Sequence, residues 1–258
     1  MKEKITIIGG GWLGVQLAEA LHDDGYTIAI SSRDPKKRLF FENNKWKSLS
    51  ISFSDTSVNI NPLEETDVLI IGLPPTGFTN YPLMISSLLS AFSTTTRVIF
   101  LSSTGVYANS TGRVSVESAL IQEHPLVVAE NIILHASNWC ILRLGGLIGP
   151  KRHPIHSLIK KVAPLNDGDS PVNLVHSHDV IQAIKMIVNQ KVNEKIFTIC
   201  NPEHPSRHDY YGLAARYFYD KDLTFNKGIP GKYVDGSAIE NYGAYKYTSS
   251  IYNFEGCK

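Results

Sequence analysis

Three glycines near the start of the chain have the spacing of a phosphate-binding turn. Gly9, Gly11 and Gly14 form a G-x-G-x-x-G pattern directly after the apolar run 5–8. In this pattern the first glycine allows a tight turn, the second lets the backbone approach a pyrophosphate, and the third lets a helix pack closely on the strand. A helix that starts here directs its free N–H groups at the phosphates. We therefore predict a dinucleotide pyrophosphate site formed by Gly9, Gly11, Trp12, Leu13 and Gly14.

The residues around these glycines fit the setting that such a site requires. Apolar residues recur at helical spacing from Leu13 to Leu21, Gly25 stands at the expected C-cap, and residues 27–31 are predicted to form a second strand. A strand, glycine turn, helix and second strand within about 30 residues is the required context. The alternative is a tight turn whose small residues serve packing alone. The surrounding pattern favours the dinucleotide site.

The end of the second strand bears on which dinucleotide is bound. An NAD site usually has an acidic residue there, which holds the ribose 2′-hydroxyl. This chain has Ser31, Ser32 and Arg33, and hydroxyls beside a guanidinium suit a 2′-phosphate. We therefore predict NADP in preference to NAD. Two alternatives stay open: Asp34 turns inward and serves NAD, or Arg33 is an ordinary exposed loop residue.

Apolar runs and helical segments alternate along most of the chain, which indicates α/β architecture. We predict a Rossmann-type, doubly wound parallel sheet with strands at residues 6–9, 27–31, 68–72, 98–102, 140–144 and 196–199. Helices are predicted at 82–92, at 178–189, and after Pro125 within 117–136. Ligands bind at the carboxyl ends of such strands. Leu73, Pro74 and Ser102 therefore join the expected cofactor site.

The chain is expected to divide into a dinucleotide-binding domain and a smaller region on the substrate side. Residues 1–200 form the predicted Rossmann domain, with a substrate loop at 149–173. Over residues 201–258 the regular alternation fades, and proline, histidine and tyrosine become dense. We expect this region and the loop to cover the substrate side.

Composition and charge exclude several classes of protein. The net charge is +1, so no overall basic field favours nucleic acid, and the run Lys36–Arg38 is expected to be solvated surface. No stretch reaches the roughly 18 uncharged apolar residues of a membrane span, and the chain begins with a strand rather than a signal peptide. These features predict a protein that acts on a small molecule rather than on nucleic acid or a membrane.

Cysteines and histidines give no sign of a metal or disulfide framework. The 3 cysteines are scattered and lack C-x-x-C spacing, which argues against a zinc site and indicates the cytoplasm. The pairs His153/His156 and His176/His178 have no nearby acidic or cysteine ligands with a recognised metal spacing. No metal is expected.

Several segments together resemble the extended short-chain dehydrogenase/reductase superfamily, in its NAD(P)-dependent epimerase/dehydratase group, and more closely an atypical bacterial branch. They are the glycine turn, IFLSSTGVY at 99–107, LRLGGLIGP at 142–150, NLVHSHDV at 173–180 and TICN at 198–201. The resemblance is specific for the fold rather than for a reaction. It implies that Ser103, with Thr104 beside it, faces the nicotinamide and the substrate. The alternative is that these hydroxyls only satisfy the end of a strand.

The resemblance also concerns the substrate side. The Gly149-Pro150 turn is similar to the one that leads into the family's substrate loop, and basic residues follow it. We expect Arg152 and His153 to contact an anionic group of a small-molecule substrate, with His176 on the same side. Asp179 matches an aspartate at a helix start, where an N-cap role is expected. Members of the family often dimerise through a helix pair, which makes a homodimer a candidate assembly.

One departure from the family pattern is decisive for the chemistry. Family catalysis depends on a Tyr-x-x-x-Lys pair after the serine motif, in which the lysine lowers the pKa of the tyrosine. Residues 108–138 contain no tyrosine and no lysine. The glycine turn also departs from the G-x-x-G-x-x-G spacing that is usual in epimerases. In an enzyme of this kind another group must move the proton, and His124 is our candidate because histidine titrates near neutral pH. The alternative is a surface histidine.

Two functions from different classes therefore stand. The first is an NADP-dependent oxidoreductase or epimerase with a rearranged proton donor, which acts on a small polar metabolite such as a nucleotide sugar. The second is a dinucleotide-binding sensor or regulatory protein without turnover. The retained Ser103 and the substrate loop favour the enzyme, whereas the missing pair favours the sensor.

Overall fold

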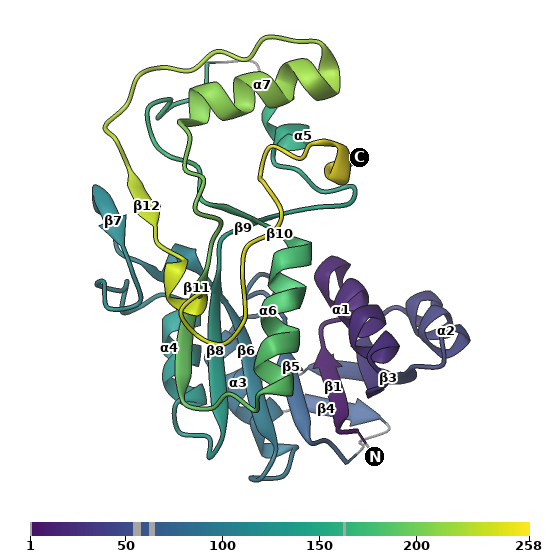
Figure 1. Ribbon diagram of the computed structural model, residues 1–258. Helices are drawn as coiled ribbons and strands as arrows, with labels where there is room; N and C mark the ends of the chain where they lie inside the picture. The colour runs from purple at the N-terminus through teal and green to yellow at the C-terminus, as the bar shows by residue number, and fades with distance from the viewer. Residues whose placement is uncertain (1, 54–57, 62–64, 162–163) are drawn as a thin grey trace. The chain divides into compact units, whose positions relative to one another are not determined.

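The computed structural model describes residues 2–53, 58–61, 65–161 and 164–258, and its centre is an eight-stranded sheet (Figure 1). The strands are β1 (Lys4–Ile8), β2 (Thr27–Ser32), β3 (Lys47–Phe53), β4 (Val58–Asn61), β5 (Val68–Ile71), β6 (Arg97–Ser103), β8 (Trp139–Leu144) and β11 (Lys195–Ile199). Their order is β11-β8-β6-β5-β1-β2-β3-β4. The pairings of β1, β2, β3, β5 and β6 are parallel, and β4 joins β3 in antiparallel register. The sheet is therefore of the Rossmann type, as the sequence predicted.

The strand β1 lies where the direction of chain winding reverses. It pairs with β2 on one side, Ile5 opposite Ile28, and with β5 on the other, Ile5 opposite Val68. The isoleucine side chains of β1 are buried because helices cover both faces of the sheet. In an open α/β sheet, ligands bind outside the carboxyl ends of the strands at such a switch point. The end of β1 is therefore the place to look for a site.

Helices connect the parallel strands of the sheet, as parallel pairing requires. They are α1 (Trp12–Asp23), α2 (Pro35–Asn43), α3 (Tyr81–Ser90), α4 (Pro125–Ile133) and α6 (Ser177–Asn189). Figure 1 shows α1 on one face of the sheet and α3 on the other. The sequence predicted α1, α3, α4 and α6 within a few residues. It did not predict α2, β3 or β4.

The chain forms two compact units whose segments are interleaved. Unit 1 comprises residues 1–102, 121–142 and 187–196, and unit 2 comprises 103–120, 143–186 and 197–258. Unit 2 contains α5 (Ile155–Leu158), α7 (Arg207–Tyr219) and two small parallel pairs, β9 (Gly146–Ile148) with β10 (Leu174–His176) and β7 (Gly112–Val114) with β12 (Lys232–Val234). The domain boundary expected after residue 200 stays a prediction. Residues 162–163 of the expected substrate loop lie outside the described residues.

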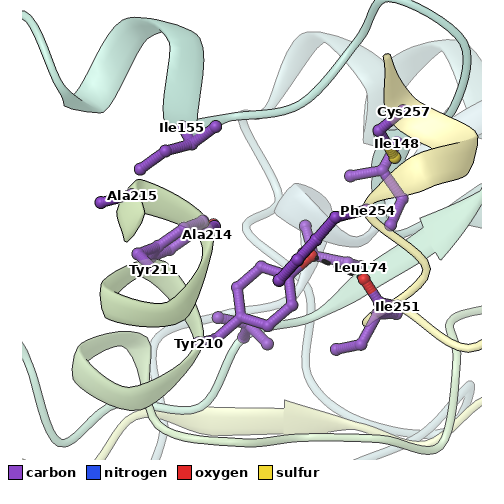
Figure 2. Close-up of a cluster of buried hydrophobic side chains, with 11 residues drawn as sticks. Ile148, Ile155, Leu174, Tyr210, Tyr211, Ala214, Ala215, Ile251, Phe254 and Cys257 are labelled. Carbon is purple, nitrogen blue, oxygen red and sulfur yellow. Dashed lines mark hydrogen bonds between the residues drawn. The ribbon is translucent and has the colours of Figure 1, made fainter. Parts of the chain in front are cut away.

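The core of unit 2 is built by α7, a helix that the sequence did not predict. Figure 2 shows Ala214 and Ala215 of α7 on the side of Ile155 of α5, and Tyr210 of the same helix beside Phe254. These α7 positions recur at helical spacing and are buried, whereas Leu213 and Tyr217 are exposed. The aromatic density of residues 201–258 therefore comes from a packed core rather than from an irregular cap.

The start of α6 differs from the expectation for Asp179. The helix begins at Ser177, and His176 is its N-cap, because the His176 Nδ1 accepts the His178 N–H at 3.1 Å. The buried Asp179 carboxylate instead accepts the backbone N–H and the hydroxyl of Thr248, each at 3.0 Å, and the backbone N–H of Ser249 at 3.2 Å. The expected N-cap role of Asp179 is wrong, and this residue anchors the segment around Thr248.

Candidate functional site

The glycine turn in unit 1 has the geometry that the three expected roles require. Gly9 adopts φ +126°, and a Cβ there would lie 3.0 Å from the backbone oxygen of Gly72. A Cβ on Gly14 would collide with the carbonyl oxygen of Gly9. A Cβ on Gly11 would meet no described atom within 4 Å, so this backbone faces open space. The turn therefore leaves room for a group to approach at Gly11 and nowhere else among these glycines.

A fourth glycine, Gly10, also has no room for a Cβ. This requirement was not predicted from the sequence. Its Cβ would lie 2.6 Å from the Ser31 carbonyl oxygen and 2.7 Å from the Phe41 ring. The Gly10 N–H donates to that carbonyl at 2.8 Å, and the Gly9 N–H donates to the Ser31 hydroxyl at 3.0 Å. Ser31, expected to contact the cofactor, is buried and holds the glycine turn against β2. The run of three consecutive glycines was the available signal.

The start of α1 is arranged to receive an anion. Its first backbone hydrogen bond runs from the Val15 N–H to the Gly11 carbonyl at 3.1 Å, and no side chain caps the helix. By contrast, Asp34 caps α2 and Asn80 caps α3. The N–H groups of the first turn and the positive end of the helix dipole thus face the open space at Gly11. Trp12 and Leu13 belong to this first turn of α1, and their contact with a cofactor stays a prediction. The residues present fit a bound pyrophosphate.

Basic side chains gather where β2 passes into α2. Arg33 is exposed, and the Arg38 Nη1 donates to the carbonyls of Ser32 at 3.0 Å and Arg33 at 3.1 Å. The Lys37 Nζ lies 3.5 Å from the Gly10 carbonyl oxygen. Asp34 accepts the Lys36 N–H at 2.9 Å, so its carboxylate serves as the cap of α2. The basic run that sequence reasoning assigned to solvated surface therefore reaches the glycine turn and the end of β2.

A cavity of about 500 Å³ lies beside these basic residues. It opens between the end of β3 and the segment before α3, and its lining combines polar side chains with Ile51, Met84 and an aromatic pair. Phe53 and Phe78 meet edge to face, with ring centroids 5.0 Å apart. The lining residues are Arg33, Arg38, Ser50, Ile51, Ser52, Phe53, Gly77, Phe78, Thr79, Asn80 and Met84.

The other residues expected to contact the cofactor follow β5 and β6. The Leu73 carbonyl accepts the Tyr81 hydroxyl at 2.7 Å, and Pro74 is exposed. Ser102 is buried, and its hydroxyl donates to Glu130 of α4 at 2.5 Å. Glu130 is 2% exposed. This pair joins the end of β6 to α4, and no pattern in the sequence indicated it.

The expected proton-moving residue, His124, is half-buried at the start of α4. Its Nδ1 accepts the Leu126 N–H at 3.1 Å, so His124 caps the helix. A neutral ring with this bond carries its proton on Nε2. The catalytic role of His124 stays a prediction.

The hydroxyls that the family resemblance singled out begin unit 2. The Ser103 Oγ accepts the Gly105 N–H at 3.1 Å, and Thr104 opens a short 3-10 turn, η1 (Thr104–Val106). Tyr107 is fully buried and shares a hydrogen bond of 2.5 Å with the Thr198 hydroxyl. The Arg143 guanidinium lies over the Tyr107 ring, 5.2 Å from its centroid. Tyr107 is thus a packing residue. The Ser103 Oγ acts as an acceptor in its bond with Gly105, so its hydroxyl proton can be donated to another group.

The residues expected on the substrate side have different surroundings in unit 2. Arg152 is exposed after the Gly149 turn. His153 is 4% exposed, its Nδ1 accepts the Ile155 N–H at 3.1 Å, and its Nε2 lies 2.8 Å from the Tyr210 hydroxyl. Burial lowers the pKa of His153 to about 4 and also lowers the pKa of His176. Both rings are therefore neutral members of a folded core, and their substrate role stays a prediction.

The described residues also bear on metal binding and on membrane-spanning helices. Within those residues, no group of three or more His, Cys, Asp or Glu side chains could hold a metal ion. Nor does any helix in the described ranges have the length and apolar character that are needed to cross a membrane.

Comparisons with known proteins place the chain in a family. No family model matches it. It is 30% identical over 267 residues to Protein YeeZ of Escherichia coli strain K12, across 95% of this chain and 96% of that protein. The structure is similar to UDP-glucuronic acid 4-epimerase from Bacillus cereus in complex with NAD, with a TM-score of 0.74, 20% identity, and coverage of 96% of this chain and 92% of that one. For vestitone reductase from alfalfa the TM-score is 0.78 at 14% identity, with coverage of 99% and 97%. The chain therefore belongs to the family of YeeZ and has the fold of the extended short-chain dehydrogenase/reductase superfamily.

Proposed function

We propose that this protein binds NADP and is an oxidoreductase or epimerase that acts on a small polar metabolite, a nucleotide sugar being one candidate. The observation that carries the proposal is the glycine turn. Its backbone is open only at Gly11, and it leads into a helix that no side chain caps. Such a start of a helix binds the phosphates of a dinucleotide.

The end of β2 supports NADP over NAD. A 2′-phosphate there would meet the guanidinium of Arg33, which lines the cavity together with Arg38. Asp34, the one acidic residue that could hold a ribose hydroxyl, is engaged as the cap of α2. A charge-assisted hydrogen bond to a phosphate contributes about 1.5–3 kcal/mol, so loss of one lowers affinity by about 10- to 100-fold.

The residues near the ends of β6 and α4 suggest how a substrate would be handled. The bound nicotinamide would supply hydride transfer. Ser103 keeps a hydroxyl proton with which to orient a substrate oxygen, whereas the Ser102 proton is committed to Glu130. An unactivated serine is a poor acid at neutral pH. We propose that His124 moves the substrate proton through Nε2. This requires its Nδ1 to release the Leu126 N–H, because the capped ring is neutral and can neither accept a proton at Nε2 nor act as an imidazolium acid.

A non-catalytic sensor is the second candidate, favoured by the absence of tyrosine and lysine from residues 108–138. Two measurements separate the candidates. Calorimetry with NADP⁺ and NAD⁺ tests binding, with Gly11→Val as the control that fills the open space. Transfer of label from C4-labelled NADPH across a panel of carbonyl metabolites and nucleotide sugars tests turnover. Binding without transfer would favour the sensor, and failure to bind either dinucleotide would refute both candidates.

A further inference from the structure

The side chain of Arg38 ties down the backbone that carries Arg33. One guanidinium nitrogen, Nη1, donates to two successive carbonyls, those of Ser32 at 3.0 Å and Arg33 at 3.1 Å. The same stretch is held from the other side, because the Ser32 hydroxyl accepts the Asp34 N–H at 3.1 Å. The peptide between Ser32 and Arg33 therefore has one orientation as the chain leaves β2 and enters α2.

We infer that Arg38 is a positioning residue for cofactor specificity, which holds Arg33 where its guanidinium can bind the 2′-phosphate of NADP. Arg33 is exposed and sits on the short connection between β2 and α2, so its direction depends on the backbone that Arg38 fixes. Both side chains line the 500 Å³ cavity. The inference rests on the proposed NADP function and deepens it.

The contact needs N–H donors on one cationic side chain. One guanidinium nitrogen serves both carbonyls, and the group keeps further donors and its charge. A lysine ammonium can also serve two successive carbonyls, as the Lys232 Nζ does for Tyr107 at 2.6 Å and Ala108 at 3.3 Å, so Arg38→Lys is the conservative variant that can restore the contact. The neighbouring Lys36 carries the same charge at an exposed position outside the cavity lining, so it provides a matched control.

The experiment measures the dissociation constants of NADP⁺ and NAD⁺, and of the fragments 2′,5′-ADP and 5′-AMP, by calorimetry. The proteins are the unmutated chain, Arg33→Ala, Arg38→Ala, Arg38→Lys, Lys36→Ala and the double variant Arg33→Ala/Arg38→Ala. We expect Arg38→Ala to lower the preference for the 2′-phosphorylated ligand about tenfold, with NAD⁺ affinity unchanged, and Arg38→Lys to restore most of that preference. Lys36→Ala should keep the preference. Unchanged NAD⁺ affinity shows that the site is folded, a result that a merely structural loss would not give.

The double variant distinguishes positioning from a separate phosphate contact. If Arg38 acts through Arg33, the double variant loses no more preference than Arg33→Ala alone. Additive losses, or full preference in Arg38→Ala, would overturn the inference. Failure of the proposed function looks different, because then the unmutated chain shows no preference for NADP⁺ or binds neither dinucleotide.

Discussion

Acidification from pH 7.5 to pH 5.0 should destabilise unit 2 through His153. The His153 Nδ1 accepts the Ile155 N–H at 3.1 Å. The Tyr210 hydroxyl donates to the Ile251 carbonyl at 3.0 Å, so the His153 Nε2–H donates to the Tyr210 oxygen. A second ring proton would point at the Ile155 N–H, a donor. The folded state therefore requires neutral His153.

The size of the effect follows from the two pKa values. Burial, with a smaller contribution from the nearby His156, lowers the pKa of His153 to about 4, whereas an unfolded histidine has a pKa of about 6.5. Between these values the unfolded state binds more protons, so stability rises with pH across this window and falls on acidification. From pH 7.5 to 5.0 the expected loss of unfolding free energy from His153 is about 2 kcal/mol. Below pH 4 this contribution stops changing.

Urea unfolding at pH 7.5, 6.5, 5.5 and 5.0 provides the assay, applied to the unmutated chain and to His153→Asn. The Asn side-chain oxygen can still accept the Ile155 N–H but has no titrating group. The difference in unfolding free energy between the two proteins should therefore shrink by about 2 kcal/mol over this range. The control His208→Asn, at an exposed histidine, should follow the unmutated chain. Parallel curves for the unmutated chain and His153→Asn would refute the reasoning.

Three further predictions concern single contacts. Gly14→Ala should lower the free energy of unfolding by about 1–3 kcal/mol, because its Cβ meets the Gly9 carbonyl. Gly11→Val should lower it by less than about 1 kcal/mol, because its Cβ meets no described atom and the substitution only places a less favourable residue at the N-cap of α1. The reverse order in thermal melts would contradict the assigned geometry. Ser102→Ala should lower the free energy of unfolding by about 1–3 kcal/mol, because it removes a hydrogen-bond donor from the buried Glu130 side chain. A double-mutant cycle with Glu130→Gln should show coupling between the two residues. Additive effects in urea unfolding would be evidence against the pair. Asp179→Asn should expose residues 245–258 to limited proteolysis, because it weakens the acceptor of three hydrogen bonds; unchanged cleavage would rule out this anchor.

The first βαβ unit could be predicted from the sequence because its signals are local. Apolar runs, helical spacing and the glycine pattern all lie within the segment that they describe. The strand β3 was missed although Leu49 and Ile51 alternate with serines, a period-two pattern that is typical of a half-buried strand. The strand β4 gave a weaker signal because it is a short edge strand. The helix α7 was missed because its buried face is built from Tyr210, Tyr211 and small alanines rather than from leucine.

The candidate site likewise contains features that the sequence indicates locally and features that depend on the fold. The expectation at Gly9, Gly11 and Gly14 depended on backbone freedom, which the residue type encodes directly. The roles of Arg38 and Glu130 depend on partners that only folding brings within reach, namely the carbonyls at the end of β2 and the Ser102 hydroxyl. The neutral state of His153 depends on burial, which spacing does not reveal.

The interleaving of the two units has a consequence for how the protein is made. The core of unit 2 joins Ile148 and Ile155 to Tyr210 and then to Ile251, Phe254 and Cys257. The last segment of unit 1, residues 187–196, comes after residues 103–120 and 143–186 of unit 2 in the sequence. Neither unit can complete its fold on the ribosome until its last segment has been synthesised, and each last segment follows residues of the other unit in the sequence. The glycine turn is synthesised first, yet a nascent chain must wait for residues 187–196 before unit 1 is whole, and for residues 251–257 before unit 2 is.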